Sequence, residues 1–276
     1  MNYIQSRWRL LITPARPGAW NMAVDEALLN SVYQGLSPPI LRLYSWEPAC
    51  LSLGYAQPMS DVDLSLLSEH GWQVVRRPTG GRAILHTAEL TYSVITPNDE
   101  PRLAGSILQS YHRIAHALLQ ALWILGIPAQ SNESSESVTH SKTAGPVCFE
   151  VPSNYEITIG GKKLIGSAQA RKREGILQHG SLPLHGDLAR ITQVLFYEDQ
   201  QERKSAAARL LERATTVADV LGHHITWESA SQAFRQAFSQ TLNLELQPQE
   251  LSSIETTLVA NLVDDKYNHP AWTNRV

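Results

Sequence analysis

Short apolar runs separated by proline and glycine are the main pattern in the first third of the chain. Runs of this kind, bounded by turn-forming residues, are typical of β-strands. They are ILRLY (40–44), CLSLG (50–54), QVVRR (73–77) and ELTYSVIT (89–96). The pattern therefore predicts that a sheet begins to form in this part of the chain.

A second group of strands is predicted further along. Its members are YEITI (155–159), KLIGSAQA (163–170) and ILQHGSLPL (176–184). Gly160 and Gly161 separate the first two, and a two-residue glycine turn between apolar runs is typical of a β-hairpin. We expect three consecutive strands joined by short turns.

Helical periodicity fills the stretches between these groups. Residues 21–33 predict a helix in which Asn21 caps the N-terminus. Asp25 and Glu26 fall in its first turns, where a carboxylate interacts favourably with the helix dipole. Residues 106–125 carry apolar side chains along one stripe, which predicts a long amphipathic helix that covers one face of the sheet.

The rest of the chain divides into a polar stretch and a tail. Residues 130–145 are rich in Ser, Thr and Glu and predict an exposed loop, whereas the tail from about residue 202 is mostly helical. Strands that arrive in hairpin groups with helices between the groups are typical of an α+β fold. We expect a central, largely antiparallel or mixed β-sheet flanked by helices.

Composition and charge narrow the class of protein. The 276 residues are 43% hydrophobic and 18% charged, as in an ordinary globular protein. A net charge of -3 without a long basic run does not favour nucleic-acid binding. No run approaches the roughly 20 apolar residues of a membrane-spanning helix, and the first residues do not resemble a signal peptide. We expect a cytoplasmic protein that binds neither nucleic acid nor membrane.

The two cysteines differ in their surroundings. Cys50 lies inside the apolar run CLSLG, which predicts a small buried residue. Cys148 lies between the polar stretch and a hairpin whose second strand begins with Lys162 and Lys163. A nearby ammonium stabilises the thiolate, which is the nucleophilic form of cysteine. Cys148 is therefore a candidate nucleophile, with a buried structural role as the alternative.

Two further segments are candidates for ligand binding. RRPTGGRAILH (76–86) combines basic side chains with two glycines, which allow the backbone to approach a ligand closely; a plain turn is the alternative. LQHGSLPL (177–184) places His179 on or beside a strand, where it could act as a base or as a hydrogen-bonded part of the packing. The same two interpretations apply to His86.

Four segments in order resemble the superfamily of lipoate-protein ligases, biotin ligases and octanoyltransferases. They are NMAVDEAL (21–28), RRPTGGRAILHTAELTYSV (76–94), GKKLIGSAQAR (161–171) and LQHGSLPL (177–184). Together with PVCFEVPSNYEI (146–157), they are most similar to cysteine-dependent octanoyltransferases, which move octanoate from octanoyl-acyl carrier protein to a lipoyl domain such as the glycine cleavage H protein. The resemblance implies one catalytic domain over residues 1–276, with a core from about 35 to 245 and a helical C-terminal tail.

The resemblance also implies roles for individual residues. Cys148 matches the nucleophile that forms an acyl thioester, and Lys163 matches the active-site lysine. The implied substrate-binding residues are Arg77, Thr79, Gly80, Gly81, Arg82, His86, Gly166, Ser167, Ala168, His179 and Gly180. The resemblance implies neither a cofactor nor a metal.

Two departures from ATP-dependent ligases favour acyl transfer. The segment TGGR (79–82) stands where those ligases usually carry SGGG. Tyr155-Glu156 stands where they tend to carry an Asn-Asp pair that helps to hold the nucleotide and its magnesium. A third departure, His86-Thr87 in place of the common His-Asp, leaves position 87 without an implied role.

Other functions stay open at this level. They are an ATP-dependent lipoate or octanoate ligase, an acyl-binding protein without turnover, and an amidotransferase that moves octanoyl between two lipoyl domains. The basic turn of residues 171–173 could steer an acidic carrier protein toward the site, or it could be a solvated turn.

Overall fold

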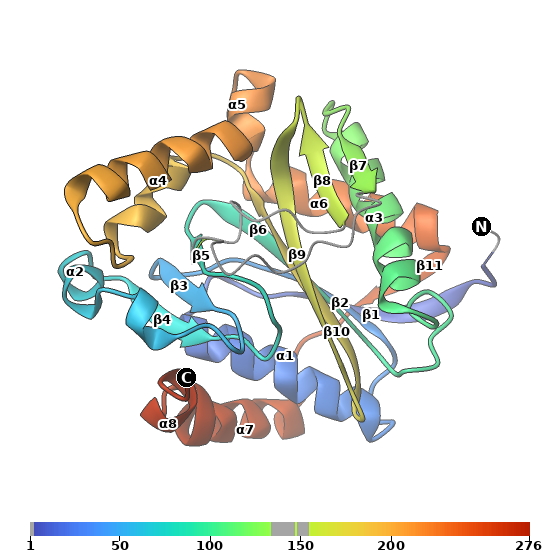
Figure 1. Ribbon diagram of the computed structural model, residues 1–276. Helices are drawn as coiled ribbons and strands as arrows, with labels where there is room; N and C mark the ends of the chain where they lie inside the picture. The colour runs from blue at the N-terminus through green and yellow to red at the C-terminus, as the bar shows by residue number, and fades with distance from the viewer. Residues whose placement is uncertain (1–2, 134–146, 148–154) are drawn as a thin grey trace.

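Two β-sheets with helices packed against them make up the structure (Figure 1). The computed structural model describes residues 3–133, 147 and 155–276. In spatial order the strands of the large sheet are β11 (Leu244–Pro248), β1 (Ser6–Ile12), β2 (Ile40–Tyr44), β6 (Glu89–Thr96), β10 (Gly175–Pro183), β9 (Lys162–Lys172), β8 (Tyr155–Ile159) and β7 (Gln130–Glu133). β11, β1 and β2 run parallel, and the other neighbours are antiparallel. The expected mixed, largely antiparallel α+β fold is confirmed.

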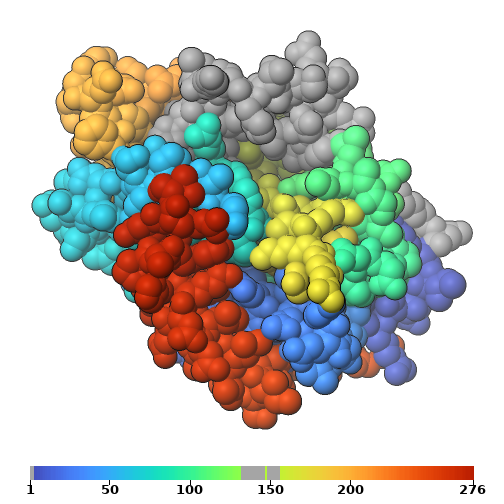
Figure 2. Space-filling view, turned by 60° about the horizontal axis from the view of Figure 1, so that its bottom comes forward, coloured from blue at the N-terminus to red at the C-terminus, as the bar shows by residue number. Residues whose placement is uncertain are grey.

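Helices cover both faces of this sheet. They are α1 (Gly18–Tyr33), α2 (Leu64–Glu69), α3 (Ile107–Ile124), α4 (Gln200–Arg213), α5 (Val217–Leu221), α6 (Trp227–Leu242), α7 (Ser253–Leu262) and α8 (Pro270–Thr273), with 3₁₀ segments η1 (Met59–Asp61) and η3 (Leu188–Gln193) and a π-helical segment η4 (Val263–Tyr267). Within the described ranges, no helix is long and apolar enough to cross a membrane. The C-terminal helices, red in Figure 2, lie against α1 and the segment that follows β2.

Alternation along the central strands gives the large sheet two apolar faces. Leu43 of β2 lies opposite Tyr92 of β6, and both belong to the core beneath α3 and α6. Tyr44 and Ile95 belong to the core on the other face, beneath α1 and α7. Successive side chains of a strand point to opposite faces, so this register fixes which residues face α1.

The small sheet carries the predicted glycine segment. β3 (Cys50–Leu53) runs parallel to β4 (Gln73–Arg76) on one side and antiparallel to β5 (Ile84–His86) on the other. The chain leaves β4, turns through residues 77–83 and returns as β5. Cys50 is fully buried in β3, and burial raises the pKa of its thiol, so its expected structural role is confirmed.

The hairpin of β8 and β9 forms as the sequence predicts. Gly160 and Gly161 have φ angles of 56° and 79°. Two consecutive positive φ values are what a tight hairpin turn of this kind requires, and glycine adopts them without steric cost. Lys163 consequently lies near the start of β9, opposite Thr158.

The first helix differs from the prediction in its start and in the role of its polar residues. α1 begins at Gly18, and Asn21 does not cap it. Asn21 is instead buried and donates through Nδ2 to two backbone carbonyl groups. Asp25 is also fully buried, where it pairs with Arg42 at 2.7 Å. The helix-dipole interpretation of Asp25 is therefore wrong, because a guanidinium inside the core binds its carboxylate.

Strands toward both edges of the large sheet are absent from the elements that the sequence pattern predicts. β1 and β11 were not predicted, because charged and polar residues interrupt their apolar pattern. Trp8 of β1 and Val259 of α7 are buried, so the hydrophobic core includes residues outside the interval of 35–245. The expected bounds of the domain core stay a prediction. The expected loop of residues 130–145 begins as strand β7, which pairs with β8; its residues 134–145 lie outside the described residues. The tail is mostly helical, as expected, but it also supplies β11.

Candidate active site

Arg77 holds the glycine turn between β4 and β5. Its Nη1 donates to the backbone and side-chain oxygens of Ser52, both at 2.6 Å, and its Nη2 donates to the carbonyl groups before and after Gly81, at 3.2 and 2.9 Å. Gly81 has a φ of 96°, a conformation that favours glycine. A Cβ atom on Gly54 would lie 1.9 Å from the carbonyl oxygen of Gly81. The turn therefore depends on a buried guanidinium and on two glycines that pack closely.

A pocket of about 40 Å³ lies between this turn and the large sheet. Its lining residues are Tyr44, Trp46, Arg77, Gly81, Ile84, His86, Thr91, Gly166, Ser167, Ala168, His179, Gly180 and Ser181. The partly or fully exposed members, which form the rim, are Gly81, Ile84, Ser167 and Ala168. The buried members that form the floor include Tyr44, Trp46, His86, Thr91 and His179.

Strand register explains how the pocket crosses the sheet. Tyr44 of β2 lies opposite Thr91 of β6, and Thr91 lies opposite Ser181 of β10. Ser181 in turn lies opposite Gly166 of β9. Residues directly opposite each other in antiparallel strands face the same side of a sheet. The pocket thus extends over four neighbouring strands, from β9 at one end to β2 at the other.

A buried ion pair supports the floor from behind. Asp25 of α1 accepts a hydrogen bond from Arg42 at 2.7 Å, and both side chains are fully buried. The hydroxyl groups of Tyr44 and Ser93 also donate to this carboxylate, at 3.1 and 3.0 Å. Burial acts to raise the pKa of Asp25, but Arg42 and His179 outweigh it, so the pKa lies below the usual 3.8. The carboxylate is therefore ionised at neutral pH.

His179 connects this ion pair to the glycine turn. Its Nδ1 lies 3.6 Å from a carboxylate oxygen of Asp25, and its Nε2 lies 2.7 Å from the hydroxyl of Thr79. Burial lowers the pKa of His179 by more than Asp25 raises it. The imidazole is therefore neutral at neutral pH, and the nearby carboxylate favours the tautomer with its proton on Nδ1. In that tautomer Nε2 accepts a hydrogen bond from Thr79.

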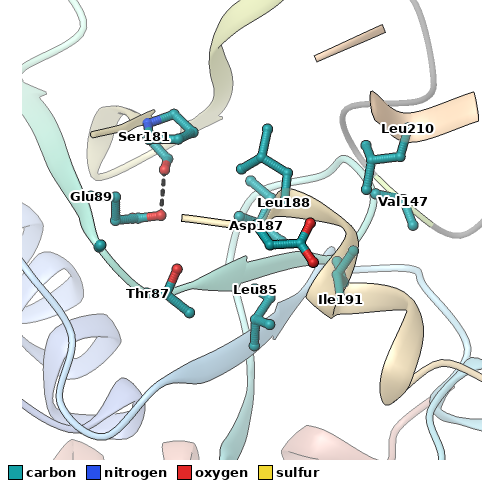
Figure 3. A pocket seen from close by; sticks show the side chains of 12 residues that line it. Leu85, Thr87, Glu89, Val147, Ser181, Asp187, Leu188, Ile191 and Leu210 are labelled. Carbon is teal, nitrogen blue, oxygen red and sulfur yellow. Dashed lines mark hydrogen bonds between the residues drawn. The ribbon is translucent and has the colours of Figure 1, made fainter. Parts of the chain in front are cut away.

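Glu89 organises a second buried cluster, and Figure 3 shows the hydrogen bond that it accepts from Ser181. His86 Nδ1 lies 2.7 Å from its Oε1, Ser181 donates to its Oε2 at 2.6 Å, and Thr91 also donates to it. Burial acts to raise the pKa of Glu89, but His86 and the hydroxyl donors lower it below the usual 4.5. Trp46 stacks on His86 with ring centres 3.9 Å apart and donates to Thr91 at 2.8 Å.

A neighbouring pocket of about 30 Å³ shares Ile84 and Ser181 with the first (Figure 3). Its apolar wall includes Leu188, Leu210 and Val147. Val147 is buried, and its backbone forms a parallel bridge with Ala83 in the glycine turn. The residue that precedes Cys148 in sequence is therefore attached to the same turn that lines the main pocket.

Lys163 is buried near the start of β9. Its Nζ lies 2.8 Å from Glu156 Oε1 across the hairpin, and the two side chains are 4% and 17% exposed. The preceding residue, Lys162, is half-buried and donates to the carbonyl oxygen of Leu211 in α4 at 2.6 Å. Cys148, the expected nucleophile, lies outside the described residues. Over the part of the chain that the structure describes, no group of His, Cys, Asp and Glu is arranged to hold a metal.

Residues 17–239 match the family model of the lipoyl protein ligase A/B catalytic domain. The chain belongs to this family. The matched interval contains α1, the small sheet and every strand that lines the pocket. The ion pair behind the floor, the glycine turn and Lys163 are thus all parts of the family domain.

Curated relatives extend the likeness over nearly the whole chain. The octanoyltransferase LipM of Symbiobacterium thermophilum is 38% identical over 275 residues, which cover 99% of this chain and 100% of that protein. The octanoyltransferase LipM of Staphylococcus aureus is 36% identical, covering 97% of this chain and 98% of that protein.

Solved structures share the fold. The bipartite lipoate protein ligase of Thermoplasma acidophilum has a TM-score of 0.78 at 27% identity and covers 99% of this chain and 97% of its own. A lipoate-protein ligase A bound with ATP has a TM-score of 0.79 at 27% identity, covering 98% of this chain and 99% of its own. This chain and the two ligases thus share one architecture.

Most of the substrate-binding residues implied by the resemblance come together. Those that line the main pocket are Arg77, Gly81, His86, Gly166, Ser167, Ala168, His179 and Gly180. Three others, Thr79, Gly80 and Arg82, belong to the turn without lining the pocket. Thr79 is buried behind it against His179, whereas Gly80 is exposed. The binding roles of all eleven residues stay predictions.

Sequence reasoning missed several residues of this site. Asp25 was assigned to the helix dipole, and Glu156 was treated only as a departure from ligases. Glu89 had a weak signal, because an ionisable residue at the start of an apolar strand needs buried partners. Trp46 gave no signal, since a single aromatic residue in a connecting segment has no periodicity to interpret.

The basic residues 171–173 lie at the end of β9 and in the turn that follows. Arg171 is partly exposed, and it donates to the carbonyl groups of Leu103 and Gly105, at 2.8 and 2.6 Å, and to the side chain of Ser110. It therefore fastens β9 to the start of α3. Steering by these three basic residues stays a prediction.

Proposed function

We propose that the protein transfers an octanoyl group from octanoyl-acyl carrier protein to a lysine of a lipoyl-domain protein, in lipoate biosynthesis. The observation that carries the proposal is the likeness to octanoyltransferases, at 38% identity over 99% of the chain. Proteins of this family act on lipoyl-domain proteins, and the glycine cleavage H protein is the acceptor we expect. The reaction requires no cofactor and no metal.

The main pocket supports an acyl substrate. Tyr44, Trp46, Ile84 and Ala168 give the lining an apolar part. The buried polar residues of the floor have hydrogen-bond partners, as Thr91 has in Trp46 and His86 has in Glu89. Burying about seven carbons of an octanoyl tail at about 0.8 kcal/mol each would supply several kcal/mol of binding energy. Binding energy of this kind lets a pocket distinguish chains by length.

The proposed chemistry has two steps. The Cys148 thiolate attacks the carbonyl carbon of the carrier thioester, a new C–S bond forms, and the carrier thiol leaves after it takes up a proton. The neutral amine of the acceptor lysine then attacks the octanoyl-cysteine. A C–N bond forms, the Cys148 thiolate leaves and the amine nitrogen loses a proton to water. A thioester is already activated toward amines, so no ATP is consumed.

Lys163 is the electrostatic partner in this proposal. Its N–H groups can stabilise the oxyanion that develops in each step, and one such donor is typically worth about 3 to 4 kcal/mol. Its charge also favours the thiolate form of Cys148. Glu156, at 2.8 Å, restrains the ammonium while both side chains remain largely buried. The bridge between Val147 and Ala83 supports the presence of the nucleophile segment beside the glycine turn.

Intact-protein mass spectrometry tests the proposal directly. After mixing with octanoyl-acyl carrier protein without nucleotide, the protein should gain one octanoyl group that hydroxylamine removes. Peptide mapping should place the group on Cys148, and Cys148→Ser should abolish transfer, because an alkoxide is much harder to generate than a thiolate. An adduct on Cys50, or wild-type transfer by Cys148→Ser, would contradict the assignment. Absence of any adduct together with stable octanoate binding would favour an acyl-binding protein.

An ATP-dependent ligase is the second candidate, favoured by the likeness to a ligase structure that contains ATP. A comparison of donors separates the two. We expect efficient transfer from the carrier thioester and little product from free octanoate with ATP. If free acid and ATP gave the faster reaction, the ligase function would replace the proposal. An octanoylated H protein as the better donor would instead indicate an amidotransferase.

A further inference from the structure

A line of four buried side chains connects the carboxylate of Glu89 to the glycine turn of residues 77–83. Glu89 Oε1 lies 2.7 Å from His86 Nδ1, and His86 Nε2 lies 2.6 Å from the hydroxyl oxygen of Ser52. Arg77 donates to that same oxygen at 2.6 Å through Nη1, and its Nη2 donates to two carbonyl groups of the turn. None of the four residues is more than 5% exposed. Together they form the Glu89 relay.

Hydrogen-bond chemistry gives the relay one direction. A guanidinium only donates, so the Ser52 oxygen accepts from Arg77, and the Ser52 hydrogen points to Nε2 of His86. Nε2 then carries no proton, and Nδ1 donates to the carboxylate of Glu89. The opposite tautomer would bring an unprotonated Nδ1 against the carboxylate, which is unfavourable because two buried acceptors would face each other without a proton. The relay therefore runs from the guanidinium to the carboxylate, with a donor facing an acceptor at each step.

The guanidinium of Arg77 transmits this order to the turn. Ser52 accepts two bonds from Nη1, one through its backbone oxygen and one through its hydroxyl oxygen, both at 2.6 Å. Because the guanidinium is planar and rigid, a fixed Nη1 also fixes the direction of Nη2. Nη2 in turn holds the carbonyl groups on either side of Gly81, whose φ is 96°. A displaced guanidinium would therefore loosen the turn.

The turn contacts the segment that contains the proposed nucleophile. Ala83, the last residue of the turn, forms a backbone bridge with Val147, which precedes Cys148 in sequence. Among the described residues, the hydrogen-bond partners of the Glu89 carboxylate all lie outside the turn; they are His86, Thr91 and Ser181. An effect of Glu89 on the turn therefore runs through the relay.

A second line of the same construction reaches the same turn. Nδ1 of His179 lies 3.6 Å from the carboxylate of Asp25, and its Nε2 lies 2.7 Å from the hydroxyl of Thr79. In both lines a carboxylate faces Nδ1 of a histidine and a hydroxyl faces Nε2. The turn is thus held twice by a buried carboxylate that acts through an imidazole, once from α1 and once from β6.

We propose that Glu89 is a positioning residue for acylation: through the relay it fixes the glycine turn and, with the turn, the segment that contains Cys148. The inference rests on the proposed function and deepens it by adding a residue that acts through others. Hydrogen bonds in a line strengthen one another, so the loss of one link weakens the whole relay. Changes at its two ends should consequently affect the same step by the same amount.

A double-mutant cycle on the full-length protein tests the proposal. Ser52→Ala removes the hydroxyl in the middle of the relay, and Glu89→Gln keeps an oxygen for His86 but removes the charge at the end. Each variant should slow acylation by saturating octanoyl-acyl carrier protein about tenfold, as expected for one buried hydrogen bond. The double variant should also be slowed about tenfold, because both changes interrupt one line. A loss near a hundredfold, the product of the two, would overturn the inference, as would single variants with the wild-type rate.

Ser31→Ala is the matched control. Ser31 is 5% exposed, and its hydroxyl forms a hydrogen bond with the carboxylate of Glu255 between α1 and α7. This variant should acylate at the wild-type rate, and its combination with Glu89→Gln should match Glu89→Gln alone. A tenfold loss in Ser31→Ala would overturn the inference, because any buried serine would then have the same effect. If the wild type forms no acyl adduct, the proposed function is wrong; an adduct with independent effects at the two positions removes only the role of Glu89.

Two measurements need no turnover. Hydrogen exchange of peptides that cover residues 78–83 should be faster in Ser52→Ala and Glu89→Gln than in the wild type and in Ser31→Ala; equal exchange in all four proteins would overturn the inference. Nitrogen-15 NMR of the wild type needs no substitution either. The ring of His86, assigned through its contact with Trp46 at 3.9 Å, should carry its proton on Nδ1. A proton on Nε2 instead would reverse the relay and overturn the inference.

Discussion

Two buried pairs of opposite charge, Arg42 with Asp25 and Lys163 with Glu156, differ in how they are held. Arg42 and Asp25 are both 0% exposed, and the planar guanidinium of Arg42 also donates to Asn21 and Thr13. In the pair of Lys163 and Glu156, the carboxylate keeps 17% exposure. Both pairs have a contact near 2.8 Å, so distance alone does not distinguish them.

The chemistry of the two cations explains the difference. The donors of an arginine form a rigid fork, which suits a fixed scaffold, whereas the ammonium of a lysine can redirect its hydrogens among several acceptors. The arginine pair accordingly fastens α1 to β2 behind the floor. In the proposed mechanism, the ammonium of the lysine pair turns a donor toward the developing oxyanion. One pair therefore maintains the shape of the pocket, and the other is suited to take part in the reaction.

Replacement of Asp25, the carboxylate of the arginine pair, should lower the free energy of unfolding more than the other changes below. Asp25→Ala leaves Arg42 as an uncompensated buried charge, and loss of one partner from a buried pair typically costs about 3 to 5 kcal/mol. The free energy of unfolding, measured by urea titration, should fall by that amount. Glu245→Ala is the control, because Glu245 pairs with Arg7 at the surface, where the two side chains are 44% and 73% exposed. It should leave the free energy of unfolding close to that of the wild type, because surface ion pairs contribute little.

Replacement of Lys163, the cation of the lysine pair, should lower the acylation rate more than it lowers the free energy of unfolding. Lys163→Ala should slow acylation about a hundredfold, the equivalent of about 3 kcal/mol, if one oxyanion donor is lost. Lys162→Ala is the control, because that side chain points away and donates to a carbonyl of α4. Stopped-flow acylation and urea unfolding of both variants provide the measurement. A larger rate loss in Lys162→Ala would contradict the assignment of the catalytic lysine.

The buried groups His179, Asp25 and Glu89 should also make the free energy of unfolding depend on pH. The pKa of His179 in the folded protein is lowered below 6.5, so the unfolded chain takes up the proton first, and this contribution to stability declines as the pH falls below about 6.5. Asp25 and Glu89 have lowered pKa values as well. Their contributions are present above about pH 4.5 and are lost as the pH falls toward the folded-state pKa values. Unfolding free energies from pH 8 to about 2.5 should decrease in two stages, and His179→Gln should remove the upper one.

The smallest expected effect concerns the hydrogen bond between Thr79 in the glycine turn and His179. Thr79→Val removes the hydroxyl that donates to His179 at 2.7 Å and should cost about 1 kcal/mol of stability. Because that bond stabilises the neutral imidazole, its loss should raise the pKa of His179. Thr79→Ser keeps the hydroxyl and should behave like the wild type. NMR titration of His179 in both variants checks this; equal pKa values in Thr79→Val and the wild type would show that the contact does not influence the ring.

Local pattern predicted much of the fold. The central strands and the β8–β9 hairpin formed as expected, because period-two alternation and consecutive glycines encode these elements within a few residues. The long helix of residues 106–125 also formed, since a sustained apolar stripe and a capping residue act over short range. β1 and β11 were missed because their stability depends on pairing between segments at opposite ends of the chain.

The local sequence pattern indicated only part of the candidate site. The glycine turn and the strands of Lys163 and His179 were singled out, and the structure brings the turn together with residues 166–168 and 179–180 around one pocket. The partners of these residues were not predicted. Glu156, Glu89 and Trp46 acquire their surroundings from strand register and from packing between the two sheets.

The sequence by itself therefore determined the element types, the tight turns and the residue classes from which the family resemblance follows, because these depend on neighbours a few positions apart. Only the tertiary structure decided that Asp25 belongs to a buried ion pair, that Arg171 fastens a strand to a helix, and that two aromatic rings line the pocket. Those roles depend on contacts between segments far apart in the chain. An ionisable or aromatic side chain has the same local pattern whether its eventual partner is water or a buried group.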